Sequence, residues 1–163
     1  MVILGVDPGL ERIGYGLVRT EGSRLEVLRH GLILSPRINL PDRLAFIHRE
    51  FRTLLSETNP DSLATERLLF AANKTTAFQV AKALGVILMV AGEQGLPWAE
   101  YSPPEVKQAV VGNGSADKKQ VQFMVRKLLS LQEDPKPDDV ADALAIAITH
   151  ALRSRITSLG TKR

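Results

Sequence analysis

The sequence predicts an α/β fold in which a mixed sheet carries helices on its faces. Strand-like segments come first, segments with helical and strand periodicity then alternate, and the last third of the chain is helical. This order favours three antiparallel N-terminal strands, joined to the later strands by crossovers. We expect strands at residues 2–6, 13–19, 24–34, 62–66 and 97–101, and helices at residues 40–57, 74–92, 103–111, 116–131 and 138–152.

Turn sequences and residue types delimit the strands. Asp7-Pro8-Gly9 ends the first apolar run. Glu21-Gly22-Ser23 separates the next two strands, which we expect to pair as a hairpin. The fourth strand is a short run of small and apolar residues that ends on Glu66. Ligand sites in such sheets tend to lie beyond the carboxyl ends of the strands, where Asp7 and Glu66 fall.

Apolar spacing and helix breakers delimit the helices. A glycine-rich loop at residues 112–115 separates two of them, and Pro137 precedes the last one. That helix is expected to end near Leu152, because residues 153–163 are basic and aperiodic and predict a flexible tail. The sequence therefore predicts one domain over residues 1–152.

Composition fits a single globular domain of 163 residues, with 44% apolar and 24% charged residues. The absence of cysteine excludes disulfides and thiolate zinc sites. The longest apolar stretch, near residues 83–91, is too short to span a membrane, and residues 1–6 lack the features of a signal peptide. We therefore expect a cytoplasmic protein without a membrane partner. The net charge of +3 permits a nucleic-acid partner without requiring one.

Carboxylates from separate segments could converge on one point. Asp7 and Glu66 end strands, while Asp139 and Asp142 lie three residues apart on one face of the last helix. Each acid also has an explanation without a metal. Asp7 could be a turn residue and Glu66 a solvated residue at a strand end. Asp138 and Asp139 could cap the last helix or be attracted to its N-terminus. These alternatives explain Asp142 poorly, because it opens a nearly all-apolar run and should face a packed or concave region.

A divalent cation would remove the repulsion among such carboxylates. Hard oxygen ligands without Cys or His favour Mg²⁺ or Mn²⁺, and a pair of such ions can support phosphodiester hydrolysis. The histidines, His30, His48 and His150, do not cluster with these acids in the sequence, and we interpret them as structural. The pattern thus predicts a metal-dependent hydrolytic site.

Taken together, several segments resemble the RuvC family of crossover junction (Holliday junction) endodeoxyribonucleases. The matching segments are residues 3–9, 14–16, 40–44, 65–66, 106–112, 114–118 and 141–147. Asp-x-Gly alone is shared with sugar-kinase and actin-type ATPases. The combination of Val-Lys-Gln-x-Val-Val-Gly, Gly-Ser-Ala-x-Lys and Asp-Ala-Leu-Ala-Ile-Ala is specific. The resemblance extends from residue 2 to about residue 152.

The resemblance implies a ribonuclease-H-like fold and a homodimer that nicks four-way DNA junctions symmetrically, in recombination and repair. It implies two Mg²⁺ ions per active site, for which Mn²⁺ could substitute, and the RuvA–RuvB branch-migration machinery as a partner. The acidic positions of the family fall on Asp7, Glu66, Asp139 and Asp142. Spacing alone leaves Asp138 as an alternative to Asp139, because it lies four residues before Asp142 and could share a helix face with it. The Asp-x-x-Asp-Ala-Leu spacing of the family favours Asp139, and we expect Asp138 to be the N-cap of the last helix.

The resemblance also points to residues that contact DNA. Many family members carry an aromatic residue three positions after the glutamate, where it stacks on bases at the junction. Here that position is Leu69 and Phe70 follows, so either Phe70 takes over the stacking or the junction is distorted differently. The candidate DNA-binding residues are Lys107, Lys118, Lys119, Arg126 and Phe70.

Basic residues in the two helices around residues 103–131 have a general alternative, which is a solvated helix face. The loop at residues 112–115 favours the functional interpretation, because backbone N–H groups before a helix N-terminus can bind phosphate. Lys118 is also a candidate catalytic residue, as a helper that stabilises charge on the phosphate.

Small residues recur at a spacing of four in the helix at residues 74–92, at Ala77, Ala81 and Gly85. They allow a second backbone to approach closely. The helix could pack through them on the sheet of its own chain, or on a second copy in the homodimer that the family implies.

Two other functions share parts of the pattern. A sugar-kinase or actin-type ATP-binding domain shares Asp7-Pro8-Gly9, but such proteins need two domains around the nucleotide, for which 163 residues are too few. A non-catalytic DNA-binding module could keep the fold, although retention of all the acids argues against it. ATP hydrolysis and Mg²⁺-dependent DNA cleavage would separate these alternatives.

Overall fold

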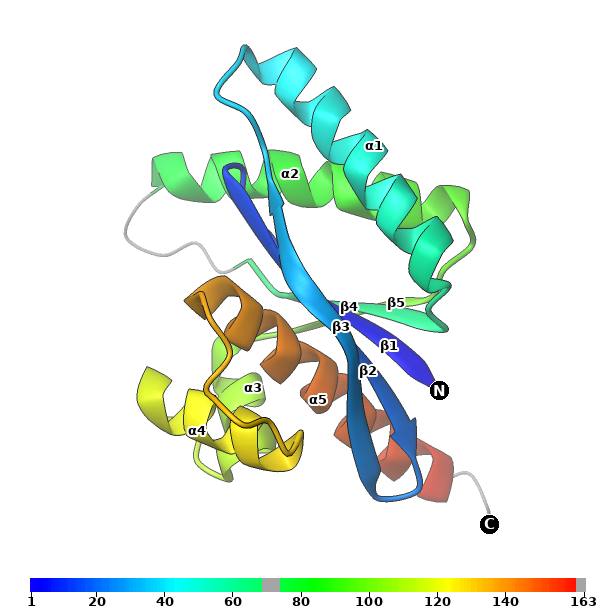
Figure 1. The fold of residues 1–163 in the computed structure, drawn as a ribbon, viewed down its shortest axis with the longest axis vertical. Helices are drawn as coiled ribbons and strands as arrows, with labels where there is room; N and C mark the ends of the chain where they lie inside the picture. Colours follow the sequence, from blue (N-terminus) through cyan, green and yellow to red (C-terminus); the bar gives the residue numbers. More distant parts are fainter. Residues whose placement is uncertain (69–73, 161–163) are drawn as a thin grey trace.

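The computed structural model describes residues 1–68 and 74–160, and within them five strands form one mixed sheet (Figure 1). The strands are β1 (Val2–Asp7), β2 (Arg12–Glu21), β3 (Arg24–Leu34), β4 (Ser62–Glu66) and β5 (Trp98–Tyr101). The helices are α1 (Leu40–Thr58), α2 (Lys74–Glu93), α3 (Pro103–Val111), α4 (Lys118–Leu128) and α5 (Asp138–Gly160). In these residues no helix is both long and apolar enough to span a membrane.

The sheet has the order β3-β2-β1-β4-β5, with the N-terminal strands antiparallel and β4 and β5 parallel to β1. The predicted mixed sheet is therefore confirmed. Val6 pairs with Thr65, so Asp7 and Glu66 follow side by side at the carboxyl ends of β1 and β4. Asp7 also pairs with Gly14 of β2. The register thus brings two acids from distant segments to one edge of the sheet.

Helices cover both faces of the sheet. Figure 1 shows α1 and α2 together on one side, and α5 with α3 and α4 on the other. A hydrophobic core lies on each face of the sheet, and alternate side chains of β1 point into one core or the other. Leu4 packs with Phe51 of α1 in one core, while Ile3 packs with Leu144 of α5 in the other. The middle of α5 is buried on all sides, as its apolar sequence predicts.

The last helix is longer than predicted. The helix continues to Gly160, so the prediction that it ends near Leu152 is wrong. The expected boundary between domain and tail therefore falls inside α5. Residues 153–159 contain neither glycine nor proline, and polar residues without apolar periodicity can still extend a helix. Conversely, α4 begins at Lys118 rather than at residue 116, because Asp117 is its N-cap and accepts a hydrogen bond from the amide of Gln120.

Glycines allow α5 to lie unusually close to β1 and β2. An added Cβ at Gly5 would overlap the backbone oxygen of Ala143, and one at Gly14 would overlap that of Asp139. At Gly16 it would meet the side chain of Leu144. At these glycines, the first turns of α5 therefore lie directly against the backbone of the sheet, with no layer of side chains between helix and sheet. This close approach carries the acids of α5 to the ends of β1 and β4.

We predict that Gly14→Ala destabilises the fold and abolishes any activity of the acidic site. The new methyl group would meet the backbone of Asp139, which cannot move aside like a flexible side chain. Overpacking of this kind costs about 1–3 kcal/mol of unfolding free energy. Thermal unfolding measures this loss.

Gly92→Ala is the matched control, because an added Cβ there meets nothing within 4 Å and the residue lies in α2. It should be neutral or stabilise the protein by up to about 1 kcal/mol. Equal melting temperatures for Gly14→Ala and Gly92→Ala would show that the contact of α5 with Gly14 does not constrain the fold.

Candidate active site

Asp7, Glu66 and Asp142 form the centre of an acidic cluster. Burial raises the pKa of Asp7 to about 7, and the negative charges of Asp142, Glu66 and Asp139 add to this effect. Burial and the charge of Asp142 raise the pKa of Glu66. These effects require the acids to lie close together, so the structure brings together the residues that the sequence singled out. Carboxylates held in this way repel each other and lack water.

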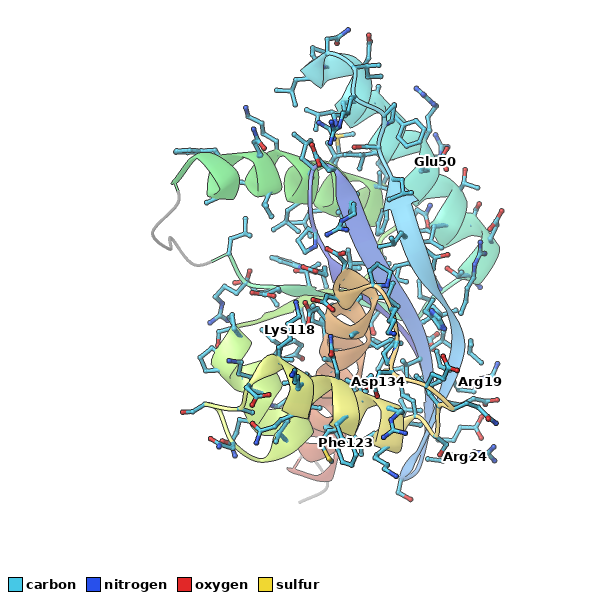
Figure 2. All side chains as sticks on the ribbon, turned by 60° about the vertical axis from the view of Figure 1, so that its left-hand side comes forward. Arg19, Arg24, Glu50, Lys118, Phe123 and Asp134 are labelled. Carbon is cyan, nitrogen blue, oxygen red and sulfur yellow. The ribbon has the colours of Figure 1, made fainter. Side chains whose placement is uncertain are left out.

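Lys118 contacts the cluster from the first turn of α4. Its Nζ lies 3.2 Å from Oδ2 of Asp142 and 3.2 Å from Oδ2 of Asp138. Figure 2 labels the position of Lys118. The pKa of Asp142 is raised by burial, and Lys118 offsets part of that rise. The position of Lys118 is fixed locally, because the N-cap Asp117 starts the helix at this residue.

Asp138 differs from its predicted role as the N-cap of α5. The carbonyl of Pro137 accepts the hydrogen bond from the amide of Val140, so Asp138 already lies within the first turn. Its carboxylate instead binds Lys118 and accepts a hydrogen bond of 2.9 Å from Gln122. The N-cap prediction is wrong because α4 offers Asp138 partners that the local sequence does not reveal.

Asp139 faces the start of β2. Oδ2 of Asp139 lies 3.2 Å from Nη2 of Arg12, and this oxygen is buried and makes no hydrogen bond. Sequence reasoning missed Arg12, because nothing near it in the chain indicates that it meets a helix more than a hundred residues later. Its position becomes evident only when the register of β1 and β2 places the end of β1 beside α5.

The donor set fits a hard divalent cation. It consists of carboxylate oxygens, and one of them is buried without a hydrogen bond. The pKa of Asp7 is raised by burial and by neighbouring negative charges that a cation would compensate. As the side chains lie, no three acidic or histidine residues in the described part of the chain already form a metal site. A cation shared by these carboxylates would therefore need an adjustment of their side chains.

A cleft of about 230 Å³ opens beside these acids. Glu66 and Asp142 line one part of it, and Lys107 of α3 and Lys118 of α4 line another. Apolar residues of α3, α4 and α5 form the rest of the wall, including Val106, Val121 and Ile146. Acids and lysines in one cleft can receive a phosphodiester together with a cation.

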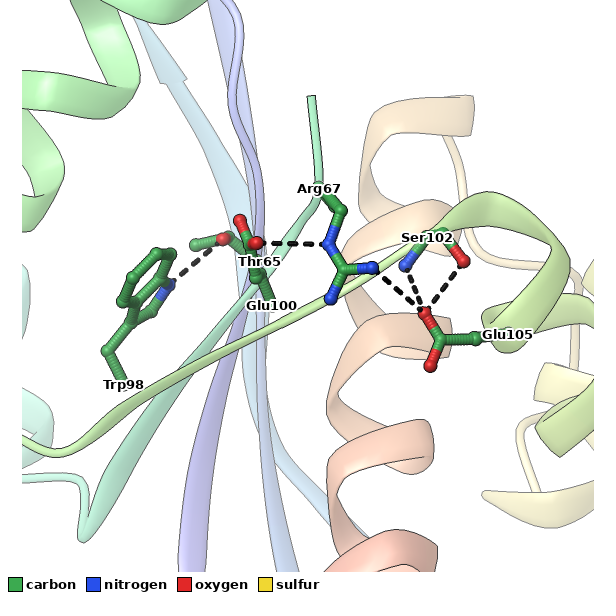
Figure 3. Close-up of polar contacts among 6 residues, drawn as sticks. All are labelled: Thr65, Arg67, Trp98, Glu100, Ser102 and Glu105. Carbon is green, nitrogen blue, oxygen red and sulfur yellow. Dashed lines mark hydrogen bonds and ion pairs between the residues drawn. The ribbon is translucent and has the colours of Figure 1, made fainter. Parts of the chain in front are cut away.

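The residues on either side of Glu66 tie the end of β4 to its neighbours (Figure 3). Thr65 accepts a hydrogen bond of 3.0 Å from the indole N–H of Trp98 on β5. Arg67 donates to Glu100 at 3.0 Å and lies 3.7 Å from Glu105 of α3. Glu66 is thus held between two anchored residues, a role for Arg67 that the sequence does not indicate.

In the loop at residues 112–115, where the sequence predicts a phosphate site, the protein itself takes up most of the backbone amides. The amide of Gly114 donates to the side chain of Gln108, and that of Ser115 donates to the side chain of Asn113. The amides of Gly112 and Ala116 bond to backbone carbonyls. A carboxylate, Asp117, already caps the following helix. These donors are occupied within the protein, so the loop has none of them to offer a phosphate.

Two other candidate DNA-binding residues, Lys119 and Arg126, do not line the cleft. Arg126 pairs with Asp134 at 2.8 Å, and its guanidinium lies 5.3 Å from the centre of the exposed ring of Phe123. Figure 2 labels Asp134 and Phe123. Lys119 lies with Phe123 along a separate shallow groove on α4. Phe70 and Leu69 lie outside the described residues. Among the described residues of this set, Lys107 and Lys118 alone line the cleft beside the acids.

The histidines lie outside the cleft, in line with the structural interpretation. His150 makes a hydrogen bond of 2.8 Å with Tyr101, and burial lowers the pKa of its imidazole. His48 lies 3.5 Å from Glu93 of α2. A hard-cation site built from carboxylates is consistent with this separation.

Comparison with known proteins identifies the family. The family model described as "Crossover junction endodeoxyribonuclease RuvC" matches residues 3–150. A protein of that name from Syntrophomonas wolfei subsp. wolfei is 50% identical over 97% of this chain and 92% of its own length.

Solved structures agree with this match. RuvC from Thermus thermophilus is 38% identical, covers 96% of this chain and 97% of its own, and superposes with a TM-score of 0.89. The same protein in complex with a Holliday junction substrate gives a TM-score of 0.91 at 38% identity, with 97% of both chains covered. The expected ribonuclease-H-like fold is confirmed. The chain therefore belongs to the RuvC family of crossover junction endodeoxyribonucleases.

Proposed function

We propose that this protein is a metal-dependent, structure-selective endonuclease that resolves four-way Holliday junctions by symmetric nicking, in recombination and DNA repair. The observation that carries the proposal is the cleft in which Glu66 and Asp142 face Lys107 and Lys118. The complex of the Thermus thermophilus relative with a Holliday junction supports the choice of substrate. A DNA substrate in a bacterial family also makes the cytoplasm the proposed location.

Asp7, Glu66, Asp139 and Asp142 are the proposed ligands of Mg²⁺, two ions per active site, with Mn²⁺ able to substitute. When bound, such ions activate water and stabilise the charge on the phosphate oxygens during phosphodiester hydrolysis. The protein contributes the positions of the oxygens: two strand ends in register, and a helix held against the sheet by glycines. Burial excludes the water that would otherwise screen these charges.

The lysines of the cleft are proposed to hold the DNA backbone. Lys118 lies closest to the acids, so its ammonium is placed to stabilise negative charge on the phosphate that reacts. Lys107 lines the same cleft from α3 and is placed for the same or a neighbouring phosphate. Lys119 and Arg126 stay proposed DNA contacts that rest on their shared face of a basic helix, and Phe70 stays one that rests on the family resemblance.

Symmetric nicking needs two active sites, and α2 offers a surface for a homodimer. Ala81 and Gly85 are exposed, and an added Cβ on Gly85 meets nothing within 4 Å. Phe78 and Met89 on the same helix are 59% and 53% exposed. α2 packs on its own sheet through other residues, such as Ile87, so the small-residue stripe is left for a second copy. The proposed protein partner beyond the dimer is the RuvA–RuvB machinery.

A non-catalytic DNA-binding module is the less favoured alternative. Such a module would gain nothing from partly buried carboxylates whose mutual repulsion and desolvation raise their pKa values. These acids destabilise the fold unless a cation compensates them. Their retention favours catalysis.

We predict that Asp7→Asn abolishes cleavage of a synthetic four-way junction in Mg²⁺ while leaving junction binding nearly unchanged. The substitution removes a proposed metal ligand but none of the lysines of the cleft. Gel assays of cleavage and binding measure both effects. Glu21→Gln, which changes an exposed carboxylate in the hairpin, is the control and should cleave normally. Near wild-type cleavage by Asp7→Asn would refute the assignment of Asp7 to the metal site.

Stability in a chelator should fall as pH rises from about 4 to 7. The pKa of Asp7 is about 7 in the folded protein against 3.8 ordinarily, so its stabilising contribution is full below pH 4 and is lost through pH 7. The difference amounts to up to about 4 kcal/mol for this residue. Melting temperatures from pH 4 to 8 should show a smaller fall for Asp7→Asn than for the wild type.

Mg²⁺ provides the second arm of that experiment. It should raise the melting temperature of the wild type most above pH 7, where Asp7 is ionised, and raise that of Asp7→Asn less. A melting temperature that is insensitive to Mg²⁺ at every pH would count against a metal site.

Lys107→Ala and Lys118→Ala should each weaken junction binding and reduce its salt dependence. Each phosphate contact that is lost lowers the slope of log K against log salt by about 0.9. Dissociation constants across a salt series provide the measurement. Arg52→Ala, an exposed residue of α1 on the other face of the sheet, is the control and should keep the wild-type slope. If both lysine variants kept the wild-type slope, the two lysines would belong to a solvated helix face and would not contact DNA phosphates.

A further inference from the structure

Arg12 contacts the acidic cluster from a different side than Lys118. It is the first residue of β2 and follows the turn that begins at Asp7. Its Nη2 atom lies 3.2 Å from Oδ2 of Asp139, one of the proposed metal ligands. The guanidinium and a metal ion would therefore compete for the same carboxylate.

The ion pair between Arg12 and Asp139 is weak enough to exchange. The side chain of Arg12 is 56% exposed, and an ion pair with an exposed partner contributes little stability. Oδ2 of Asp139 makes no hydrogen bond, so the contact lacks the geometry of a strong bidentate pair. A divalent cation, with twice the charge and direct coordination, should take the carboxylate from the guanidinium.

Only the side chain of Arg12 has to move in this exchange. Its backbone is fixed by the pairing of β2 with β3, where Arg12 lies opposite Leu34. The turn packs against the carbonyl of Arg12, since an added Cβ at Gly9 would overlap that oxygen. A displaced guanidinium therefore stays at the edge of the acidic cluster, and its planar set of donors matches a phosphate group.

We propose that Arg12 is an exchangeable counter-ion that couples metal binding to DNA binding, an inference that rests on the proposed function. When Asp139 binds a divalent cation, Arg12 leaves the carboxylate and binds a phosphate of the junction. Arg12 thus opposes metal binding in free protein and strengthens DNA binding in metal-loaded protein. Coupling of this kind is reciprocal, so DNA also favours the metal-loaded form.

Arg12→Gln tests the proposal through two binding measurements that do not depend on cleavage. Calorimetric titration of the DNA-free protein should show Mg²⁺ binding about two- to fivefold tighter than in the wild type, because one competing ion pair is gone. Junction binding in Ca²⁺, which has the same preference for oxygen ligands, should be about tenfold weaker. In EDTA the wild type and the variant should bind the junction with nearly equal affinity, because Asp139 retains Arg12 there.

Arg19→Gln is the matched control. Arg19 lies on the same strand, is 43% exposed and pairs with Glu26 at 3.6 Å, away from the cluster. Its removal should leave Mg²⁺ affinity unchanged and alter junction binding equally in Ca²⁺ and EDTA. Arg12→Lys keeps the positive charge, so it should restore part of the difference in junction affinity between Ca²⁺ and EDTA.

The proposal is overturned if Arg12→Gln leaves Mg²⁺ affinity unchanged, or weakens junction binding equally in Ca²⁺ and EDTA. In either case a wild type that binds Mg²⁺ and cleaves the junction would leave the proposed function intact. A wild type that binds neither Mg²⁺ nor the junction would overturn both proposals.

Discussion

The contact of α5 with the glycines of β1 and β2 determines where the acids of this protein lie. A side chain at Gly5 or Gly14 would overlap the backbone of the helix, so the separation of helix and sheet depends on these positions. Gly14 pairs with Asp7 and touches Asp139, which means that one glycine links two acids of the cluster. The same contact buries the apolar middle of α5. The packing that stabilises the fold is therefore also the packing that concentrates negative charge.

That concentration of charge has to be compensated. Lys118 of α4 and Arg12 of β2 reach the carboxylates from two sides, and neither cation is fully buried. Exposed cations of this kind give weak pairs, so they moderate the repulsion without saturating the oxygens. The cluster can thus exist in a folded protein and still favour a divalent cation. A fully buried cationic side chain would be costly to displace, because its removal would leave the carboxylates buried and unpaired, and it would therefore obstruct a metal ion.

Features that depend on local sequence pattern can be predicted from the sequence alone. Strand ends at Asp7 and Glu66 follow from apolar runs and turn residues, and the concave surroundings of Asp142 follow from the apolar helix that it opens. The positions of helix ends are harder to predict from local pattern. Asp138, for example, is not an N-cap, because its side chain binds Lys118 and Gln122 of α4. The roles of Arg12 and Arg67 depend on contacts between segments far apart in the chain, which periodicity cannot reveal.

The loop at residues 112–115 illustrates how a correct motif can have a different physical role. Its glycines suggest an anion site, yet Gln108 and Asn113 take up the amides of Gly114 and Ser115. These hydrogen bonds make the loop a defined connection between α3 and α4. Lys107 lies on the first of these helices and Lys118 begins the second, and both lysines line the cleft. The hydrogen bonds of the loop thus stay within the protein, and its role is to connect the two helices whose lysines line the cleft.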